Sequence, residues 1–354
     1  MLTHTLASLV CVYSCMSQCS MEGESSPKSP SLKIQKTAKT QLAALKEMTV
    51  VVADTGDYAK IQAFCPQDAT TNPSLLLQAA QLPEYSELVD SVVAAAKSAG
   101  LSDDALVEDI CDRLSVAFGV EILKIIPGRV STEVDASLSF DKVGSLAKAR
   151  KLIKLYSELG IGQDRILIKL ASTWEGVETA RELESEGIHC NMTLIFNYHQ
   201  AIACAQAGAT LISPFVGRIL DWFVKNAPFA QPYTKLTDPG VVSVTKIYNY
   251  FKTHGHNTTV MGASFRSKDE ILGLAGIDSL TISPKLLEEL EKSTEPIEQI
   301  LRPVAHNLPE IRVSEPCFRW ALNEDQMATE KLSEGIRNFN KDADKLRNLV
   351  KMRI

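Results

Sequence analysis

The sequence predicts a single (β/α)8 TIM barrel with an added C-terminal helix, and three observations support this fold class. From Lys33 onward, short runs rich in Val, Ile and Leu alternate with longer stretches of helical period. Runs such as ILIKLA and TLISPFV are apolar on both faces, as expected for parallel strands covered by helices. The 354 residues also suffice for such a barrel, which typically uses about 250.

Eight strand candidates follow one another along the chain. They cover Thr49–Asp54, Ala69–Asn72, Ile122–Ile126 continuing to Asp135, Arg165–Ala171, His189–Phe196, Thr210–Val216, Thr258–Phe265 and Ser279–Ser283. Eight strands joined by helical crossovers favour a closed barrel over an open doubly wound sheet. We expect residues 38–354 to form the barrel domain and residues 1–37 to be a disordered or atypical N-terminal extension.

Helical patterns fill the intervals between the strands. Apolar residues recur at three- and four-residue spacing in Leu146–Leu159, Val177–Glu186, Ala201–Ala207, Val241–His254 and Pro284–Glu291. Glycines such as Gly160 and Gly208 stand where a helix gives way to a strand. The last stretch, Asp325–Ile354, predicts one long helix that packs onto the barrel.

Composition argues against several classes of partner and cofactor. The 37 basic and 43 acidic residues give a net charge of −6 without basic runs, so we expect neither nucleic acid nor an anionic membrane as a partner. No G-x-G-x-x-G or G-K-[ST] motif occurs. The histidines show no metal-ligand spacing beyond His254 and His256, for which helix capping is the simpler explanation, so we expect no metal site.

The N-terminus and the cysteines indicate a cytoplasmic protein. A secretory signal needs a basic first region, but no Lys or Arg precedes Lys28, and Met21 is an alternative start. The eight cysteines contain no C-x-x-C pair, which argues against a zinc finger or a disulfide scaffold. Secretion is the less favoured alternative.

In a (β/α)8 barrel the chemistry lies at the carboxyl ends of the strands. Seven of the eight predicted strands end in polar residues that apolar packing does not explain, and the eighth contributes none. These residues are Asp54; Thr70 and Asn72; Ser131, Glu133 and Asp135 on one face of the third strand; Lys169; Asn191 and Thr193; Ser213 beside Phe215; and Ser264 with Arg266.

Lys169 carries the most information among these residues. Burying an ammonium group is costly, which favours the free amine, and a free amine facing a carbonyl can form a Schiff base. Asp54 and Glu133 could then carry the protons that such chemistry moves. The alternative is structural: Lys169 would pair with Glu133, and the acids would be caps. Lys124, in the run EILKIIP, has a similar setting.

Two arginines predict an anion site. Arg218 follows the sixth strand at a predicted helix start, and Arg266 follows the seventh. Paired guanidinium groups near helix N-termini suit a phosphate group. Surface salt bridges are the alternative explanation for both residues.

Long ordered motifs extend over the chain from about residue 40 to its C-terminus. They are VVADTGD (51–57), DATTNPSL (68–75), PGRVSTEVDA (127–136), RILIKLASTW (165–174), CNMTLIF (190–196), LISPFVGRILDW (211–222), DPGVVS (238–243) and VMGASFR (260–266). In these motifs the sequence resembles the transaldolase family, and within it the long-chain subfamily.

The resemblance implies an activity in the non-oxidative pentose phosphate pathway. Members transfer a dihydroxyacetone unit from sedoheptulose 7-phosphate to glyceraldehyde 3-phosphate, giving erythrose 4-phosphate and fructose 6-phosphate, without a cofactor. By resemblance Lys169 is the Schiff-base lysine, Asp54 the acid/base at the cleaved bond and Glu133 an acid/base acting through a water. The substrate-binding residues would be Thr70, Asn72, Asn191, Thr193, Ser213 and Phe215, and the phosphate-binding residues Arg218, Ser264 and Arg266.

Alternatives to this function remain open at the level of the sequence. A related Schiff-base aldolase would release free dihydroxyacetone, and a sugar-phosphate-binding homologue without activity would have lost Lys169 or Asp54. A secreted or second role would rest on the N-terminal residues. The resemblance also implies sugar phosphates as substrates and a homodimer as the assembly.

Overall fold

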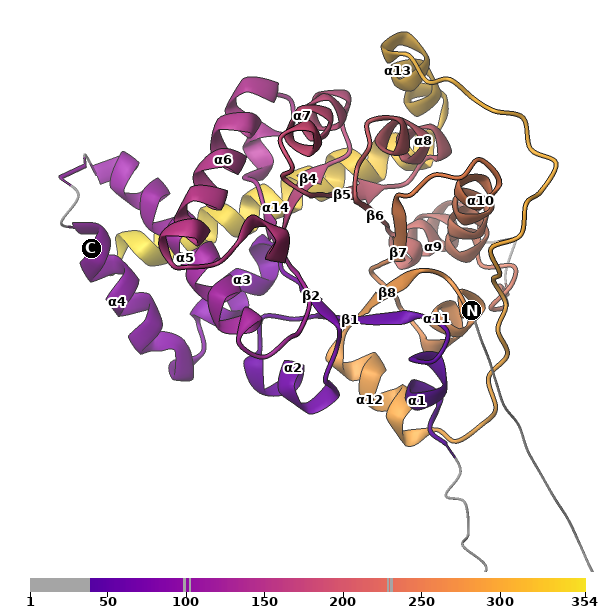
Figure 1. Cartoon of the computed structure of the whole chain (residues 1–354), viewed down its shortest axis with the longest axis horizontal. Helices are drawn as coiled ribbons and strands as arrows, with labels where there is room; N and C mark the ends of the chain where they lie inside the picture. The colour runs from indigo at the N-terminus through magenta and orange to yellow at the C-terminus, as the bar shows by residue number, and fades with distance from the viewer. Residues whose placement is uncertain (1–38, 98–99, 102, 228, 230–231) are drawn as a thin grey trace, which may run out of the picture. The chain divides into compact units, whose positions relative to one another are not determined.

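The computed structural model describes residues 39–97, 100–101, 103–227, 229 and 232–354, so the predicted extension over residues 1–37 lies outside the described residues. Eight parallel strands close into a barrel in the order β1 to β8, with β8 paired back to β1 (Figure 1). Helices surround this ring, which confirms the predicted (β/α)8 fold.

The strands are short and the helices between them are longer. The strands are β1 Val50–Asp54, β2 Asp68–Thr70, β3 Val130–Glu133, β4 Ile166–Ala171, β5 Cys190–Ile195, β6 Leu211–Pro214, β7 Thr259–Gly262 and β8 Ser279–Ile282. The helices are α1 Gln41–Leu45, α2 Tyr58–Phe64, α3 Pro73–Ala80, α4 Ser86–Lys97, α5 Asp103–Leu123, α6 Lys142–Glu158, α7 Trp174–Ser185, α8 Tyr198–Gln206, α9 Val216–Asn226, α10 Pro239–Thr253, α11 Lys268–Gly273, α12 Pro284–Lys292, α13 Glu315–Glu324 and α14 Gln326–Lys351, with 3-10 turns η1 Pro83–Tyr85, η2 Ala136–Leu138 and η3 Gln163–Arg165.

The third strand differs from the prediction. The predicted segment Ile122–Ile126 is the end of α5 and the turn after it, and β3 covers only Val130–Glu133. The apolar residues of this segment continue the helical period of α5, in which Ile110, Leu114, Phe118 and Ile122 lie four residues apart and are buried. Lys124 is therefore outside the barrel: its side chain is 63% exposed and pairs with Glu121.

The barrel interior has an apolar floor. Val52, Leu167, Leu211 and Met261, from four different strands, form a separate buried cluster. Side chains two positions further along a strand point to the same side of it. The positions above the floor are therefore occupied by Asp54, Lys169, Ser213 and Ala263, all of which line one cavity.

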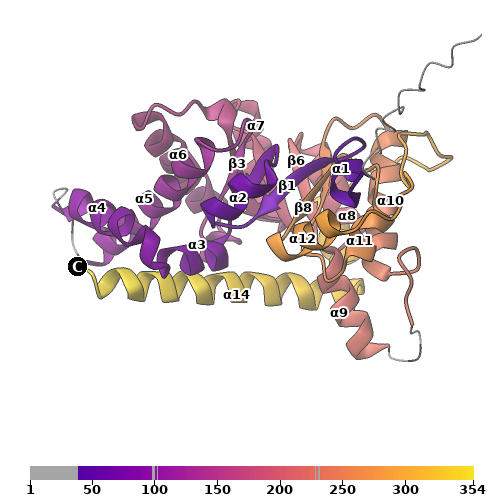
Figure 2. The same ribbon diagram turned by 90° about the horizontal axis from the view of Figure 1, so that it is seen from below.

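The C-terminal helix covers the carboxyl ends of the strands. Figure 2 shows α14 running along one side of the barrel, from α4 to α9, and it packs against α3, α5 and α9. Asp325 caps its first turn by accepting from the Ala328 N–H. Its apolar stripe, with Leu332, Ile336 and Phe339, joins a buried cluster with residues that follow β5 and β6. The single long helix predicted over Asp325–Ile354 is confirmed.

None of the helices within the described ranges is both long enough and apolar enough to cross a membrane.

Candidate active site

A cavity opens above the apolar floor, at the carboxyl ends of the strands. It is lined by Asp54, Thr70, Asn72, Lys169, Ser213, Phe215, Arg218, Ala263, Ser264, Thr281 and Phe339. Most of the residues predicted from the sequence are among them. Glu133 and Asn191 join the group through sheet register, because both are direct register partners of Lys169 on the neighbouring strands.

Lys169 lies at the centre of this group and is buried. Its Nζ is 3.2 Å from Glu133 Oε2 and donates a hydrogen bond to the Thr71 carbonyl at 3.2 Å. The Phe339 ring from α14 lies 5.8 Å from Nζ and closes the apolar side. The lysine is thus held by one carboxylate and one carbonyl, with its amino group at the cavity.

Asp54 ends β1 beside Lys169 and accepts a hydrogen bond from Thr70 Oγ1 at 2.9 Å. Burial raises the pKa of this carboxyl, and the charges of Lys169 and Arg218 only partly offset that effect. A buried carboxyl with a raised pKa takes up and releases a proton closer to neutral pH than an exposed one does. This behaviour suits a general acid and base.

Glu133 is the second buried carboxyl near Lys169. Burial raises its pKa, Lys169 opposes this, and the charge of Asp54 adds to it. On β5, two strands further on, the Thr193 hydroxyl is buried and has no hydrogen-bond partner among the described residues. A buried hydroxyl of this kind normally bonds to an ordered water.

A bulge in β5 accompanies Thr193. The β5–β6 register shifts between Met192 and Ile195, so one extra residue stands on β5. Leu194 takes up the irregularity with a φ of 57°, a value that L side chains rarely adopt. Strained backbone of this kind persists where the surrounding packing fixes it, and here the strained residue directly follows Thr193.

Amide side chains form a polar layer around the amine. Asn191 Nδ2 donates to Ser131 Oγ at 3.0 Å, and its Oδ1 accepts from Ser213 Oγ at 2.7 Å. Asn72 caps α3 by accepting from the Leu75 N–H at 3.0 Å, which leaves its amide NH2 as the group available to a ligand. These groups suit hydroxyl recognition.

The two predicted anion-binding arginines are not equivalent. Arg218, in the first turn of α9, places its guanidinium 4.7 Å from the Phe215 ring centroid and 5.5 Å from that of Phe339. Burial lowers the pKa of Arg218, and the nearby charge of Arg266 lowers it further. A phosphate dianion between the two guanidinium groups would relieve this repulsion.

Arg266 lies at the rim, with 41% of its side chain exposed, and it already pairs with Asp221 through Nη2 at 2.6 Å. Its Nη1 donates to the Ser264 carbonyl at 3.0 Å. Ser264 has a φ of 62°, and its carbonyl also accepts from the Gly217 N–H at 3.1 Å. Gly217 permits this approach, because a Cβ there would stand 2.4 Å from the Ser264 oxygen.

Three cavity-lining residues, Ala263, Thr281 and Phe339, were not predicted from the sequence, and one candidate was misplaced. Thr281 of β8 and Phe339 of α14 both line the cavity. The alternation of hydroxyl residues in SLTIS was the available signal for Thr281. Asp135 is not on the inner face of β3: it follows the strand, caps η2, and forms an ion pair with Arg347 of α14.

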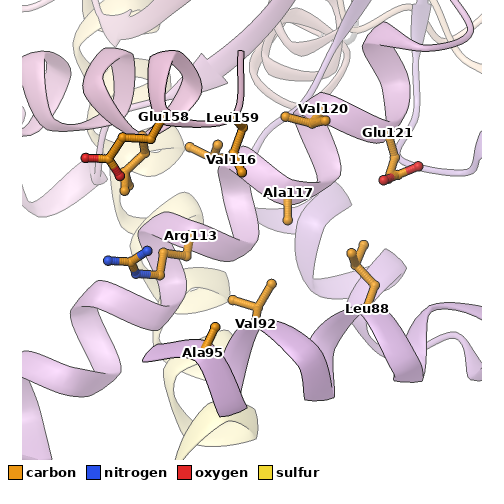
Figure 3. A pocket seen from close by; sticks show the side chains of 11 residues that line it. Leu88, Val92, Ala95, Arg113, Val116, Ala117, Val120, Glu121, Glu158 and Leu159 are labelled. Carbon is orange, nitrogen blue, oxygen red and sulfur yellow. The ribbon is translucent and has the colours of Figure 1, made fainter. Parts of the chain in front are cut away.

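A second pocket lies outside the barrel, in a groove between α4, α5 and α6 (Figure 3). Its walls are mostly apolar, as with Val92, Val116 and Leu159, and charged side chains such as Arg113 and Glu158 stand at its edge. It contains none of the predicted site residues. Within the described part of the chain, no three His, Cys, Asp or Glu side chains converge as a metal site.

Comparison with known proteins gives one consistent family. A family model described as Transaldolase/Fructose-6-phosphate aldolase matches residues 51–350. A transaldolase of Marinomonas sp. (strain MWYL1) is 60% identical over 312 residues, which cover 88% of this chain and 98% of the relative. A transaldolase of Shewanella denitrificans is 58% identical over 314 residues, again 88% of this chain and 98% of the relative.

Proposed function

This chain belongs to the Transaldolase/Fructose-6-phosphate aldolase family, and we propose that its barrel cavity performs the transaldolase reaction through an imine on Lys169. The reaction moves a dihydroxyacetone unit from sedoheptulose 7-phosphate to glyceraldehyde 3-phosphate and yields erythrose 4-phosphate and fructose 6-phosphate. The observation that carries the assignment of roles is the buried Lys169 amine, which lies 3.2 Å from one buried carboxyl, that of Glu133, and shares its cavity with a second, that of Asp54.

Imine formation is the first chemical stage. The Lys169 amine attacks the C2 carbonyl of the ketose phosphate and gives a carbinolamine. This intermediate loses its hydroxyl as water, and the departing oxygen needs a proton. Glu133 supplies that proton through a water bound at Thr193, whose buried hydroxyl has no hydrogen-bond partner among the residues described.

Carbon–carbon cleavage follows on the imine. Asp54 removes the proton of the C4 hydroxyl, the C3–C4 bond breaks, and its electron pair enters the imine to give an enamine. The aldehyde fragment leaves. The enamine carbon then bonds to the carbonyl carbon of the acceptor aldehyde, Asp54 returns its proton to the new hydroxyl, and hydrolysis of the imine restores Lys169.

The polar layer holds the substrate during these steps. The amides of Asn72 and Asn191, with Ser213 and Thr70, bind the dihydroxyacetone hydroxyls, and Phe215 packs beside them. Arg218, Ser264 and Arg266 hold the phosphate of the substrate. The support for this division is that Asn191 is the register partner of Lys169 and bonds to Ser213. The Arg218 guanidinium instead stacks on the Phe215 ring, and Arg266 is partly exposed at the rim.

The test separates the two acids by the adduct that each variant accumulates. After borohydride reduction with fructose 6-phosphate, Asp54→Asn should carry the six-carbon sugar phosphate, because imine forms but cleavage stalls. Glu133→Gln should instead form any adduct more slowly. General acid–base groups contribute about 10²–10⁴-fold, so both effects are measurable by mass spectrometry.

The exposed Asp141, which caps α6, provides the control as Asp141→Asn, because Asn caps a helix equally well. This variant should accumulate the three-carbon adduct at the wild-type rate. Accumulation of the same adduct at the same rate by Asp54→Asn would refute the role assigned to Asp54.

A Schiff-base aldolase that releases dihydroxyacetone to water is the second candidate activity, and the family description includes aldolases. Incubation of fructose 6-phosphate with and without erythrose 4-phosphate distinguishes the two. A transaldolase yields sedoheptulose 7-phosphate with the acceptor and little free dihydroxyacetone without it.

The chain also acts, in our proposal, as a cytoplasmic homodimer. Phosphorylated sugars are charged and do not cross membranes freely. This supports a location of the protein in the compartment where its substrates are made. Light scattering at micromolar concentration tests the dimer, for which twice the 38.8 kDa chain mass is expected.

A further inference from the structure

Two threonines link Asp54 to the eighth strand. Thr70 Oγ1 of β2 donates to Asp54 Oδ1 at 2.9 Å, and Thr70 Oγ1 is in turn 2.8 Å from Thr281 Oγ1 of β8. Strands β2 and β8 are the two neighbours of β1 in the barrel. The side chains of both threonines are buried, with 3% and 4% exposure for Thr70 and Thr281.

The number of protons that each hydroxyl can donate fixes the direction of these two hydrogen bonds. A hydroxyl group has one proton to donate and can accept with its lone pairs. Because Thr70 gives its proton to the ionised Asp54, the bond between the two threonines must be donated by Thr281. The hydrogen bonds are therefore donated from Thr281 to Thr70 and from Thr70 to the carboxylate.

Hydrogen bonds that all point the same way strengthen the last bond in the series, which here is the one that the charged carboxylate accepts. Hydrogen bonds to an ionised group are stronger than neutral ones, and each donor in a chain polarises the next. Donation to the charged form also favours that form over the protonated acid. Without the Thr281 proton, the Thr70 oxygen loses its donor, and its own bond to Asp54 weakens.

We propose that Thr281 is a positioning residue for carbon–carbon cleavage, acting through Thr70 to keep Asp54 ionised and oriented toward the C4 hydroxyl. The inference rests on the role proposed above for Asp54. It assigns a contribution to the eighth strand, which the sequence left without one. Thr281 has no part in imine formation, because that step depends on Lys169 and Glu133.

The test compares Thr281→Val, which keeps the shape and removes the hydroxyl, with Thr281→Ser, which keeps the hydroxyl. Thr281→Val should lower kcat about 3- to 10-fold, the range for loss of one hydrogen bond. It should also move the acidic limb of the kcat–pH profile to higher pH, because the carboxylate is less favoured. KM and the rate of borohydride trapping should stay at wild-type values. Thr281→Ser should restore kcat and the profile.

A double variant tests the route through Thr70. If Thr281 acts only through Thr70, then Thr70→Val combined with Thr281→Val should be no slower than Thr70→Val alone. Fully additive losses would overturn the proposed route. Ser279→Ala is the matched control: its hydroxyl is also buried on β8 but donates to the Val50 carbonyl at 3.2 Å, so its pH profile should be that of the wild type.

Failure of the proposed function and failure of the inference about Thr281 would give different results. If the wild-type enzyme itself gives no adduct on Lys169, the proposed function fails. If wild type is trapped normally but Thr281→Val cleaves at the wild-type rate with an unshifted pH profile, only the inference about Thr281 is overturned. A Thr281→Val enzyme that loses trapping together with kcat would also overturn it, since the residue would then serve the fold.

Discussion

The two arginines that we propose bind the phosphate, Arg218 and Arg266, should contribute unequally to substrate affinity. Arg218 is packed between the Phe215 and Phe339 rings, so a phosphate there meets a desolvated guanidinium. Charge-assisted hydrogen bonds contribute about 1.5–3 kcal/mol, and Arg218→Ala should therefore raise KM for fructose 6-phosphate about 10- to 150-fold.

Arg266→Ala should have a smaller effect. Its guanidinium is 41% exposed and already paired with Asp221 at 2.6 Å. Exposed ion pairs contribute about 0.2–1 kcal/mol because water and salt screen them, which corresponds to at most about a 6-fold rise in KM. The structure thus predicts an order of contributions to phosphate binding, Arg218 before Arg266.

The assay measures KM with fructose 6-phosphate and with unphosphorylated fructose as donors. Both variants should lose affinity only for the phosphorylated donor. Arg150→Ala is the control, because Arg150 is similarly exposed, at 45%, and pairs with Glu182 and Glu186. Equal losses for both donors, or a larger loss for Arg266→Ala than for Arg218→Ala, would refute the reasoning.

Two further predictions concern stability. Burial and the nearby charge of Asp238 raise the pKa of Glu270 from 4.5 to about 7. Between these two pH values folding therefore takes up a proton. The free energy of unfolding should fall by up to about 3 kcal/mol as the pH rises from the lower value to the higher one. Thermal melting at pH 5 and pH 8 should show a smaller fall for Glu270→Gln than for wild type, and equal falls would contradict the assignment. Gly119→Ala should lower Tm, because the new Cβ would stand 1.8 Å from the buried Tyr156 hydroxyl; overpacking typically costs about 1–3 kcal/mol, and an unchanged Tm in calorimetry would show that the ring can move away.

The barrel was predictable because its signal is local and repeated. Each parallel strand is a short apolar run, and a polar residue inside such a run, like Lys169 in ILIKLA, stands out against it. The exception was the predicted strand through Lys124. There the apolar run is the end of a 21-residue helix. The helical spacing of the apolar residues is distinguishable only over the whole of α5.

The site was predictable only where a polar residue interrupts a strand. Thr281 gave a weak signal because Thr is an ordinary strand former. Phe339 gave none, since an aromatic residue on an amphipathic helix is normally core. The pairing of Asp135 with Arg347, 212 residues away, and that of Arg266 with Asp221 depend on tertiary packing that no local pattern contains.

The most direct test of the central claim is the position of the covalent adduct. Borohydride reduction of the enzyme with fructose 6-phosphate, followed by peptide mass mapping, should label Lys169, the buried amine 3.2 Å from Glu133. Lys124, a 63% exposed lysine paired with Glu121, serves as an internal control and should stay unlabelled. Lys169→Arg should abolish the label, because a guanidinium does not form the imine. A label on Lys124, or none on wild type, would contradict the account.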